Sequence, residues 1–157
     1  MTAQTSGLYD DDLYAWTIDQ AGKLRQLARE RANSEIDLEN LAEEIESVGK
    51  RDRRELHSRL ARIIEHVLKL AESTLWEPRN GWQNSVRAER ASLEKLFEQS
   101  PSLRAAAADE IADAFGHAFR RLEHQLIELS MDPLPLVCPY DLGQLLDRDW
   151  WPEPRER

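Results

Sequence analysis

The sequence predicts an all-α fold, an antiparallel bundle of about four main helices with a proline-rich extended strap and a short C-terminal helix. Apolar residues recur at spacings of three and four along most of the chain, as they do in amphipathic helices. Clusters of turn-forming residues interrupt this pattern at only a few places. No stretch alternates apolar and polar residues in the manner of a strand. We therefore expect one helical domain over residues 1–157, with an ordered core at about residues 8–152.

The first two predicted helices cover about residues 10–31 and 37–74. The aspartates at positions 10–12 provide carboxylates that can cap the start of the first helix. Asp37 is the predicted N-cap of the second helix, whose apolar stripe continues past Gly49 without a proline or a turn cluster. We expect a single long helix here, with Gly49 as the position at which it can bend.

Turn-forming residues gather after this long helix, in the segment WEPRNGW at residues 76–82. Pro78 and the Asn80-Gly81 pair are typical of a turn, so the segment should end the long helix. A third helix is expected from about residue 82 to residue 99, because apolar residues resume there at helical spacing.

The fourth predicted helix starts at Pro101, since Ser100 followed by proline is a typical helix start, and its apolar stripe runs to Leu129. The proline-rich segment at residues 131–139 should be an extended strap across the bundle. Asp141 is the expected cap of a short last helix, after which Trp150 and Trp151 should dock on the bundle.

Composition limits the classes of function that fit. The chain has 41% hydrophobic and 32% charged residues, which suits a folded domain in water. No apolar run approaches the roughly 20 residues that a membrane span needs, and the N-terminus does not resemble a signal peptide, so we expect a cytoplasmic protein and no membrane partner. The single cysteine, Cys138, excludes an internal disulfide. A net charge of −9 disfavours nucleic acid as a partner.

Several strings along the chain resemble a bacterial family called domain of unknown function 29. They occur in order and cover nearly the whole sequence: YDDDLYAW at 9–16, DLENLAEEIESVG at 37–49, HVLKL at 66–70, SPSLR at 100–104 and CPYDLGQLLD at 138–147. The resemblance implies a small helical protein and implies no activity, cofactor or catalytic residue. The chain departs from the family pattern after the long helix, where EPRNGW keeps Arg79 and Trp82 but lacks the family's serines.

Metal-binding patterns typical of helical bundles are absent from the sequence. None of the four histidines follows a glutamate by three residues, and there is no HExxH string. Glu110, Asp113, His117 and His124 share a helical face, but this column lies at the rim of an apolar stripe and is typical of solvated side chains. We therefore expect no metal and no cofactor.

His66 is the strongest candidate for a catalytic residue. It lies beside the apolar stripe of the long helix, with Arg59 and Arg62 at helical spacings that can place them nearby. An imidazole with neighbouring arginines could serve an RNase or another hydrolase as acid, base and charge stabiliser. The competing interpretation is a half-buried histidine hydrogen-bonded to a neighbouring helix.

A basic stripe extends from Lys50 to Arg62 and includes Arg51, Arg53 and Arg54 as candidate phosphate-binding residues. Ion pairing along and between helices is the favoured explanation of such a stripe. The stripe also lacks the interleaved aromatic residues on which bases stack.

Five tryptophans are many for a chain of this length, and tryptophan is enriched where proteins meet partners. Trp150 and Trp151 are therefore candidate binding residues. The function that the sequence favours is a non-enzymatic interaction module, binding another protein or a second copy of itself as a homodimer. A hydrolase centred on His66 and a nucleic-acid binder using the basic stripe are the alternatives.

Overall fold

The computed structural model describes residues 5–31 and 33–155, and the all-α fold is confirmed. Within these residues there is no β-strand, and the backbones of Ser73 and Met131 form an isolated antiparallel bridge. The described residues form six helices: α1 (Thr5–Asp11), α2 (Leu13–Glu30), α3 (Leu38–Glu72), α4 (Arg79–Gln99), α5 (Pro101–Leu122) and α6 (Leu142–Leu146).

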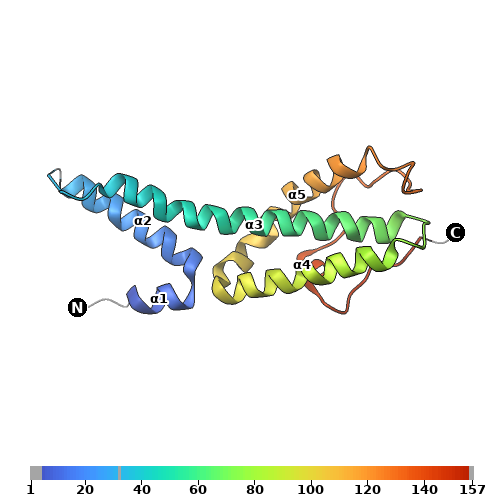
Figure 1. Cartoon of the computed structure of the whole chain (residues 1–157), viewed down its shortest axis with the longest axis horizontal. Coiled ribbons are helices and arrows are strands. Elements are labelled where there is room, and N and C mark those ends of the chain that lie inside the picture. The colour runs from blue at the N-terminus through green and yellow to red at the C-terminus, as the bar shows by residue number, and fades with distance from the viewer. Residues whose placement is uncertain (1–4, 32, 156–157) are drawn as a thin grey trace. The chain divides into compact units, whose positions relative to one another are not determined.

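The chain divides into two compact units, and the three longest helices contribute to both (Figure 1). Unit 1 comprises Met1–Glu55 and Leu96–Ala105, and unit 2 comprises Leu56–Lys95 and Ala106–Arg157. The expectation of a single domain over residues 1–157 stays a prediction.

In unit 1, Asp12 separates two helices where the sequence predicted one helix from about residue 10. Asp12 has an extended backbone, with φ −156° and ψ 90°, and its carboxylate accepts a hydrogen bond from Ala15 N, as an N-cap does. The same carboxylate accepts from Ser102 N at 2.7 Å and from Ser102 Oγ at 2.8 Å. These bonds favour the cap conformation, so α1 ends at Asp11 and α2 begins at Leu13.

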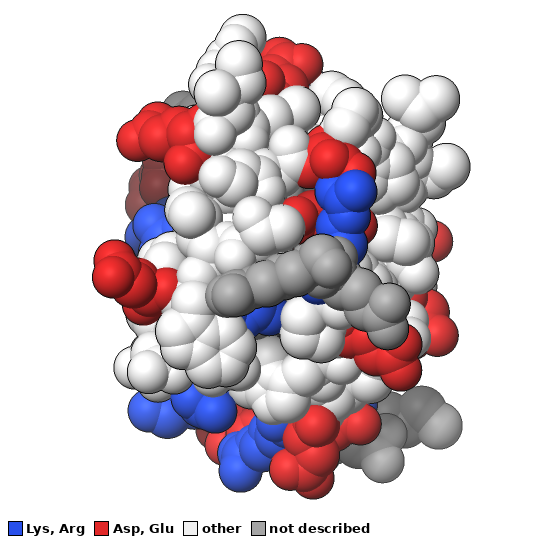
Figure 2. Space-filling view, turned by 90° about the vertical axis from the view of Figure 1, so that its right-hand side faces the viewer, with Lys and Arg blue, Asp and Glu red and all other residues white. Residues whose placement is uncertain are grey.

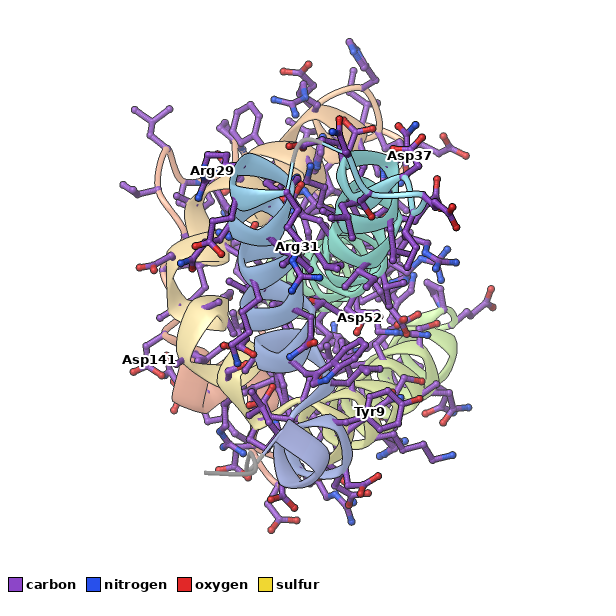
Figure 3. All side chains as sticks on the ribbon, turned by 90° about the vertical axis from the view of Figure 1, so that its left-hand side faces the viewer. Tyr9, Arg29, Arg31, Asp37, Asp52 and Asp141 are labelled. Carbon is purple, nitrogen blue, oxygen red and sulfur yellow. The ribbon has the colours of Figure 1, made fainter. Side chains whose placement is uncertain are left out.

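The connection between α2 and α3 follows the predicted capping chemistry. Asp37 Oδ1 accepts a hydrogen bond from Asn40 N at 3.2 Å, which satisfies one of the free amides at the start of α3. Figure 3 shows Asp37 at this start, and Arg29 and Arg31 at the end of α2, where positive charge interacts favourably with the helix dipole. The end of α2 and the start of α3 therefore lie close to where the sequence indicates.

Gly49 does not break the long helix, because α3 is continuous from Leu38 to Glu72. The residue is buried, and a Cβ added to it would lie 2.4 Å from Thr17 Oγ1 on α2. Glycine is needed here because α2 approaches the α3 backbone closely, and not because the chain bends or turns.

Replacing Gly49 with alanine should destabilise the protein. Alanine favours a helix over glycine by about 1 kcal/mol, but here its methyl group would clash with Thr17 at a cost of about 1–3 kcal/mol. The matched control is Gly22→Ala on α2, where an added Cβ meets nothing within 4 Å, and this change should be neutral or stabilising. Urea unfolding of both variants checks the pair, and a Gly49→Ala protein at least as stable as Gly22→Ala would contradict the close-approach explanation.

In unit 2, the core consists of aliphatic and aromatic side chains from α3, α4 and α5. Among the largest fully buried ones are Leu56, Leu60, Ile63, Ile64, Leu68, Val86, Leu93 and Leu122. Burying such side chains supplies about 1.5–3 kcal/mol each, which fixes the three helix segments on one another.

The Asn80-Gly81 pair lies inside α4, so the turn predicted there is wrong. The turn is confined to residues 73–78. Arg79 begins α4, and its guanidinium donates hydrogen bonds to Leu70 O at 2.6 Å and to Ser73 O at 3.3 Å. These bonds pair carbonyl groups at the end of α3 that have no partner within that helix, and they bring the start of α4 forward by three residues.

The fourth helix is shorter than predicted, because α5 ends at Leu122 and residues 123–130 form hydrogen-bonded turns. Ser130 has a φ of 50°, a left-handed conformation that a helix cannot continue through. Ser73 Oγ donates to Leu129 O at 2.5 Å, and Thr74 N donates to Ser130 O at 3.3 Å. The apolar stripe predicted that the fourth helix continues to Leu129. Hydrogen bonds from Ser73 and Thr74, just after α3, instead hold the end of this segment in a non-helical conformation.

The strap leaves much of its apolar surface open. Leu134 is buried, whereas Leu136 and Val137 are exposed.

Figure 2 shows a face of the molecule on which uncharged residues occupy much of the surface and charges of both signs are scattered among them. Along the described ranges, no helix has both the length and the apolar character that crossing a bilayer requires.

Candidate functional site

The C-terminal segment of unit 2 is held by a buried arginine on α4. Arg90 is 2% exposed, and its guanidinium donates hydrogen bonds to Leu145 O at 2.8 Å, Trp150 O at 3.1 Å and Gln144 O at 3.2 Å. Gln144 and Leu145 lie in the last turn of α6, whose carbonyl groups have no partners within so short a helix. One side chain therefore ties both α6 and the tryptophan segment to α4.

The start of α6 is capped as the sequence predicted. Asp141 Oδ1 accepts from Gln144 N at 2.8 Å, and Gln144 Oε1 accepts from Asp141 N at 3.0 Å, which is a complete capping box. Both ends of this short helix thus have hydrogen-bond partners, so the backbone that leads to the two tryptophans is well fixed.

Trp151 lies against two guanidinium groups of α4. The Arg87 and Arg90 guanidinium carbons are 5.1 Å and 5.0 Å from the centre of the Trp151 ring, within the range of cation–π attraction. Burial lowers the pKa of Arg90; the charge of Asp147 opposes this effect and that of Arg87 adds to it. The site therefore brings two like charges to one indole ring.

Two hollows adjoin this tryptophan segment. The first, which we call the arginine pocket, has a volume of about 360 Å³ and is lined by Arg87, Arg90, Ala91 and Arg148. Arg148 donates a hydrogen bond from Nε to Glu94 Oε1 at 2.7 Å and makes a second contact through its Nη2.

The second hollow, which we call the aromatic cleft, has a volume of about 780 Å³. Its lining residues are Ala71, Glu72, Pro139, Tyr140, Gln144, Trp150, Trp151, Pro152, Glu153 and Arg155. The Tyr140 and Trp150 rings pack edge to face, with centres 5.2 Å apart. Burial raises the pKa of Tyr140 to about 12, so its hydroxyl stays neutral and can donate a hydrogen bond.

The predicted catalytic residues His66, Arg59 and Arg62 do come together in unit 2. Arg59 and Arg62 both donate to the buried carboxylate of Glu89, at 2.7 Å and 3.0 Å. The negative charge of Glu89 favours a raised pKa of His66, and the positive charge of Arg62 favours a lowered one. These arginines are engaged in ion pairs that join α3 to α4, which is a structural arrangement.

His66 itself is half-buried, and its Nδ1 is buried without a hydrogen-bond partner in the described part of the chain. Burial, followed by the positive charge of Lys69, lowers its pKa. The neighbouring acid, Glu65, accepts from Lys69 Nζ at 2.8 Å and from Arg121 at 3.3 Å. The acid and base groups that a hydrolase would need near His66 are thus used by other partners.

The predicted binding residues fall into two groups in different units. Lys50, Arg51, Arg53 and Arg54 are exposed residues of α3 in unit 1, and Lys50 Nζ pairs with Glu46 at 3.1 Å. Trp150 and Trp151 belong to unit 2 and line the aromatic cleft.

A histidine chain that the sequence did not predict joins α3 to α5. His57 Nδ1 lies 3.3 Å from Glu110 Oε2, and His57 Nε2 lies 2.5 Å from His117 Nδ1. Because a carboxylate only accepts, His57 Nδ1 carries the hydrogen of the first bond. Burial, followed by the charge of His57, lowers the pKa of His117. These hydrogen bonds between side chains thus link α3 to α5.

The column of Glu110, Asp113, His117 and His124 is not assembled as a metal site. Within residues 5–31 and 33–155, no three or more histidine, cysteine or acidic side chains are grouped so as to hold a metal ion. Glu110 and His117 instead bond to His57, and His124 Nε2 lies 3.5 Å from its neighbour Glu123.

The arginines of the site were missed by sequence reasoning, although one signal was available. Val86, Arg90, Leu93 and Phe97 follow one another at spacings of four, three and four, so Arg90 occupies a core position of the α4 stripe. An arginine at a core position indicates a buried charge that needs partners.

The lowered pKa of His66 predicts acid sensitivity. Unfolded His66, with an ordinary pKa of 6.5, takes up a proton that the folded protein resists, so the free energy of unfolding should fall as pH drops below about 6.5. His66→Gln should make this fall shallower, by at most about 1.4 kcal/mol per pH unit. Urea unfolding at several pH values measures it. His124→Gln, at an exposed position, is the control; an equal slope in His66→Gln and the native protein would contradict the prediction.

Comparisons with known proteins agree with the helical fold. A crystal structure of an alpha-helical protein of unknown function from Rhodospirillum rubrum is similar, with a TM-score of 0.74 and 28% sequence identity over 90% of each chain. No curated protein matches the chain. The model of the family described as Domain of unknown function DUF29 matches residues 8–151, which is nearly the whole sequence. The chain therefore belongs to the DUF29 family.

Proposed function

We propose that the protein is a non-enzymatic interaction module that binds an extended segment of a partner protein in the aromatic cleft. The observation that carries this proposal is the cleft itself, about 780 Å³ lined by Tyr140, Trp150 and Trp151 together with two prolines. Pockets of this size with aromatic walls and a few polar groups are typical binding sites. Tyrosine and tryptophan also supply much of the binding energy at protein interfaces.

The walls of the cleft are ordered by contacts within unit 2. Arg90 fixes the backbone of Trp150, the capping box fixes Gln144, and Arg155 N donates to Ala71 O at 2.9 Å. A partner that binds ordered side chains loses less of its binding energy to the ordering of the site. This preorganisation supports a binding role for the tryptophan segment, in addition to its packing role.

The alternatives have less support. A hydrolase needs an accessible imidazole with a free acid or base, whereas Glu65 and Glu89 beside His66 are in ion pairs. A nucleic-acid interface needs unpaired positive charge, and Lys50 of the basic stripe pairs with Glu46.

Site-directed photocrosslinking in growing cells tests the proposal. A benzophenone amino acid replaces Glu153, an exposed residue that lines the cleft, or Glu128, an exposed residue of the turns after α5 that does not. We expect a discrete crosslinked protein at Glu153 and none at Glu128. The Glu153 crosslink should be lost when Trp150→Ala is added, and retained when Trp76→Ala, which alters an exposed tryptophan outside the cleft, is added.

The identity of the crosslinked protein then separates a partner from a second copy of the chain, which would make the cleft a homodimer contact. Equal crosslinking at Glu153 and Glu128, or a Glu153 crosslink that survives Trp150→Ala, would contradict binding in the cleft.

A further inference from the structure

The arginine pocket differs from the buried ion pairs of unit 2 because three arginine side chains contribute to its walls. Among the described residues, Arg87, Arg90, Arg148 and Ala91 line it. By contrast, the buried carboxylates of Glu65 and Glu89 each have two cationic partners. The pocket therefore places three positively charged side chains around one hollow.

The partners of Arg90 are neutral. In the described part of the chain its hydrogen bonds go to three backbone carbonyl groups, and none goes to a carboxylate. A charge this deeply buried is costly unless an opposite charge compensates it. Arg87 increases the cost, because it lies over the same Trp151 ring and carries the same charge.

Nearby acidic groups compensate only part of this charge. Glu94 pairs with Arg148. Asp147 and Asp149 are exposed, and their negative charges interact electrostatically with Arg90 and Arg148, respectively. None of the three acids lines the pocket. Arg87 and Arg90 thus line the hollow, and no carboxylate is hydrogen-bonded to either guanidinium group among the described residues.

We propose that the arginine pocket binds an oxyanion, a carboxylate or a phosphate group, carried by a ligand that enters beside Trp151. Guanidinium groups match the oxygen geometry of both anions and form strong charge-assisted hydrogen bonds with them. The net charge of −9 opposes such binding only weakly, because salt screens distant charges beyond about 8–10 Å.

Trp151 belongs to the lining of the aromatic cleft and packs on two arginines of the pocket. A protein segment in the cleft could therefore place an acidic or phosphorylated side chain in the pocket. This inference rests on the proposed function only for the source of the oxyanion, because the pocket would accept the same group from a small molecule.

Titration with free anions tests the pocket. Inorganic phosphate and glutarate are the probes, sodium chloride at matched ionic strength is the reference, and the readout is the Trp151 indole N–H signal in NMR spectra of isotope-labelled protein, assigned through Trp151→Phe. We expect a saturable shift with phosphate, with glutarate or with both, and none with chloride. Saturation by only one of the two identifies the class of oxyanion.

Variants assign the shift to the pocket. Arg87→Gln and Arg148→Gln change exposed arginines, so they should fold, and each should weaken binding about tenfold because a charge-assisted hydrogen bond is lost. Glu94→Gln should tighten binding, because Arg148 is then no longer neutralised by its partner. Arg104→Gln, an exposed arginine of α5 in unit 1, is the control and should leave the affinity unchanged.

The inference is overturned if neither anion shifts the Trp151 signal more than chloride does. It is equally overturned if Arg87→Gln and Arg148→Gln bind as tightly as the native protein. Either outcome leaves the crosslinking result at Glu153 untouched, so failure of the pocket is distinguishable from failure of the proposed function.

Discussion

The candidate site depends on the three hydrogen bonds that the buried guanidinium of Arg90 donates to the C-terminal segment. They satisfy carbonyl groups that α6 and the residues after it leave unpaired, and they set the backbone of Trp150. Trp151 then packs on Arg87 and Arg90. The aromatic cleft uses Trp150 and Trp151 as walls, and the arginine pocket uses Arg90 itself, so both hollows depend on Arg90.

The buried charged groups of unit 2 differ in their partners. Some form ion pairs that stabilise the helix packing, and among the described residues Arg90 does not. Glu65 and Glu89 are buried carboxylates that each pair with two cations, and in this way they stabilise the packing of α3 with α4 and α5. Leaving such a buried carboxylate without any cationic partner is expected to cost several kcal/mol, about 3–5, so these ion pairs contribute to the stability of unit 2. Arg90, by contrast, has neutral partners and lies beside open space, as expected for a group that can also meet an anionic ligand.

Local chemistry made much of the fold predictable. The carboxylates of Asp12, Asp37 and Asp141 each accept a backbone N–H at the helix start that follows, and Pro101 begins α5, because capping depends on residues close in sequence. The errors involve hydrogen bonds between different elements of the fold. Ser73 bonds to the chain after α5 and Arg79 to the end of α3, and no local pattern shows these partners.

The candidate site was only half predictable. Trp150 and Trp151 stood out because tryptophan is enriched where proteins meet partners, and they do line the aromatic cleft. Their arginine partners were missed because a sequence shows the helical face of Arg90 but not the segment that will pack on it. His57 was missed for the same reason, since its partners Glu110 and His117 lie on another helix.

Hydrogen exchange of individual amides tests the role of Arg90 most directly. The amides of Leu145, Asp147 and Arg155 donate backbone hydrogen bonds in the C-terminal segment, and core amides of α3 provide the internal reference. In Arg90→Lys, the three C-terminal amides should exchange much faster while the α3 amides remain protected, because a lysine cannot reach three carbonyl groups with one ammonium. Arg87→Lys should leave both sets unchanged. Equal protection of the C-terminal amides in Arg90→Lys and the native protein would contradict the account.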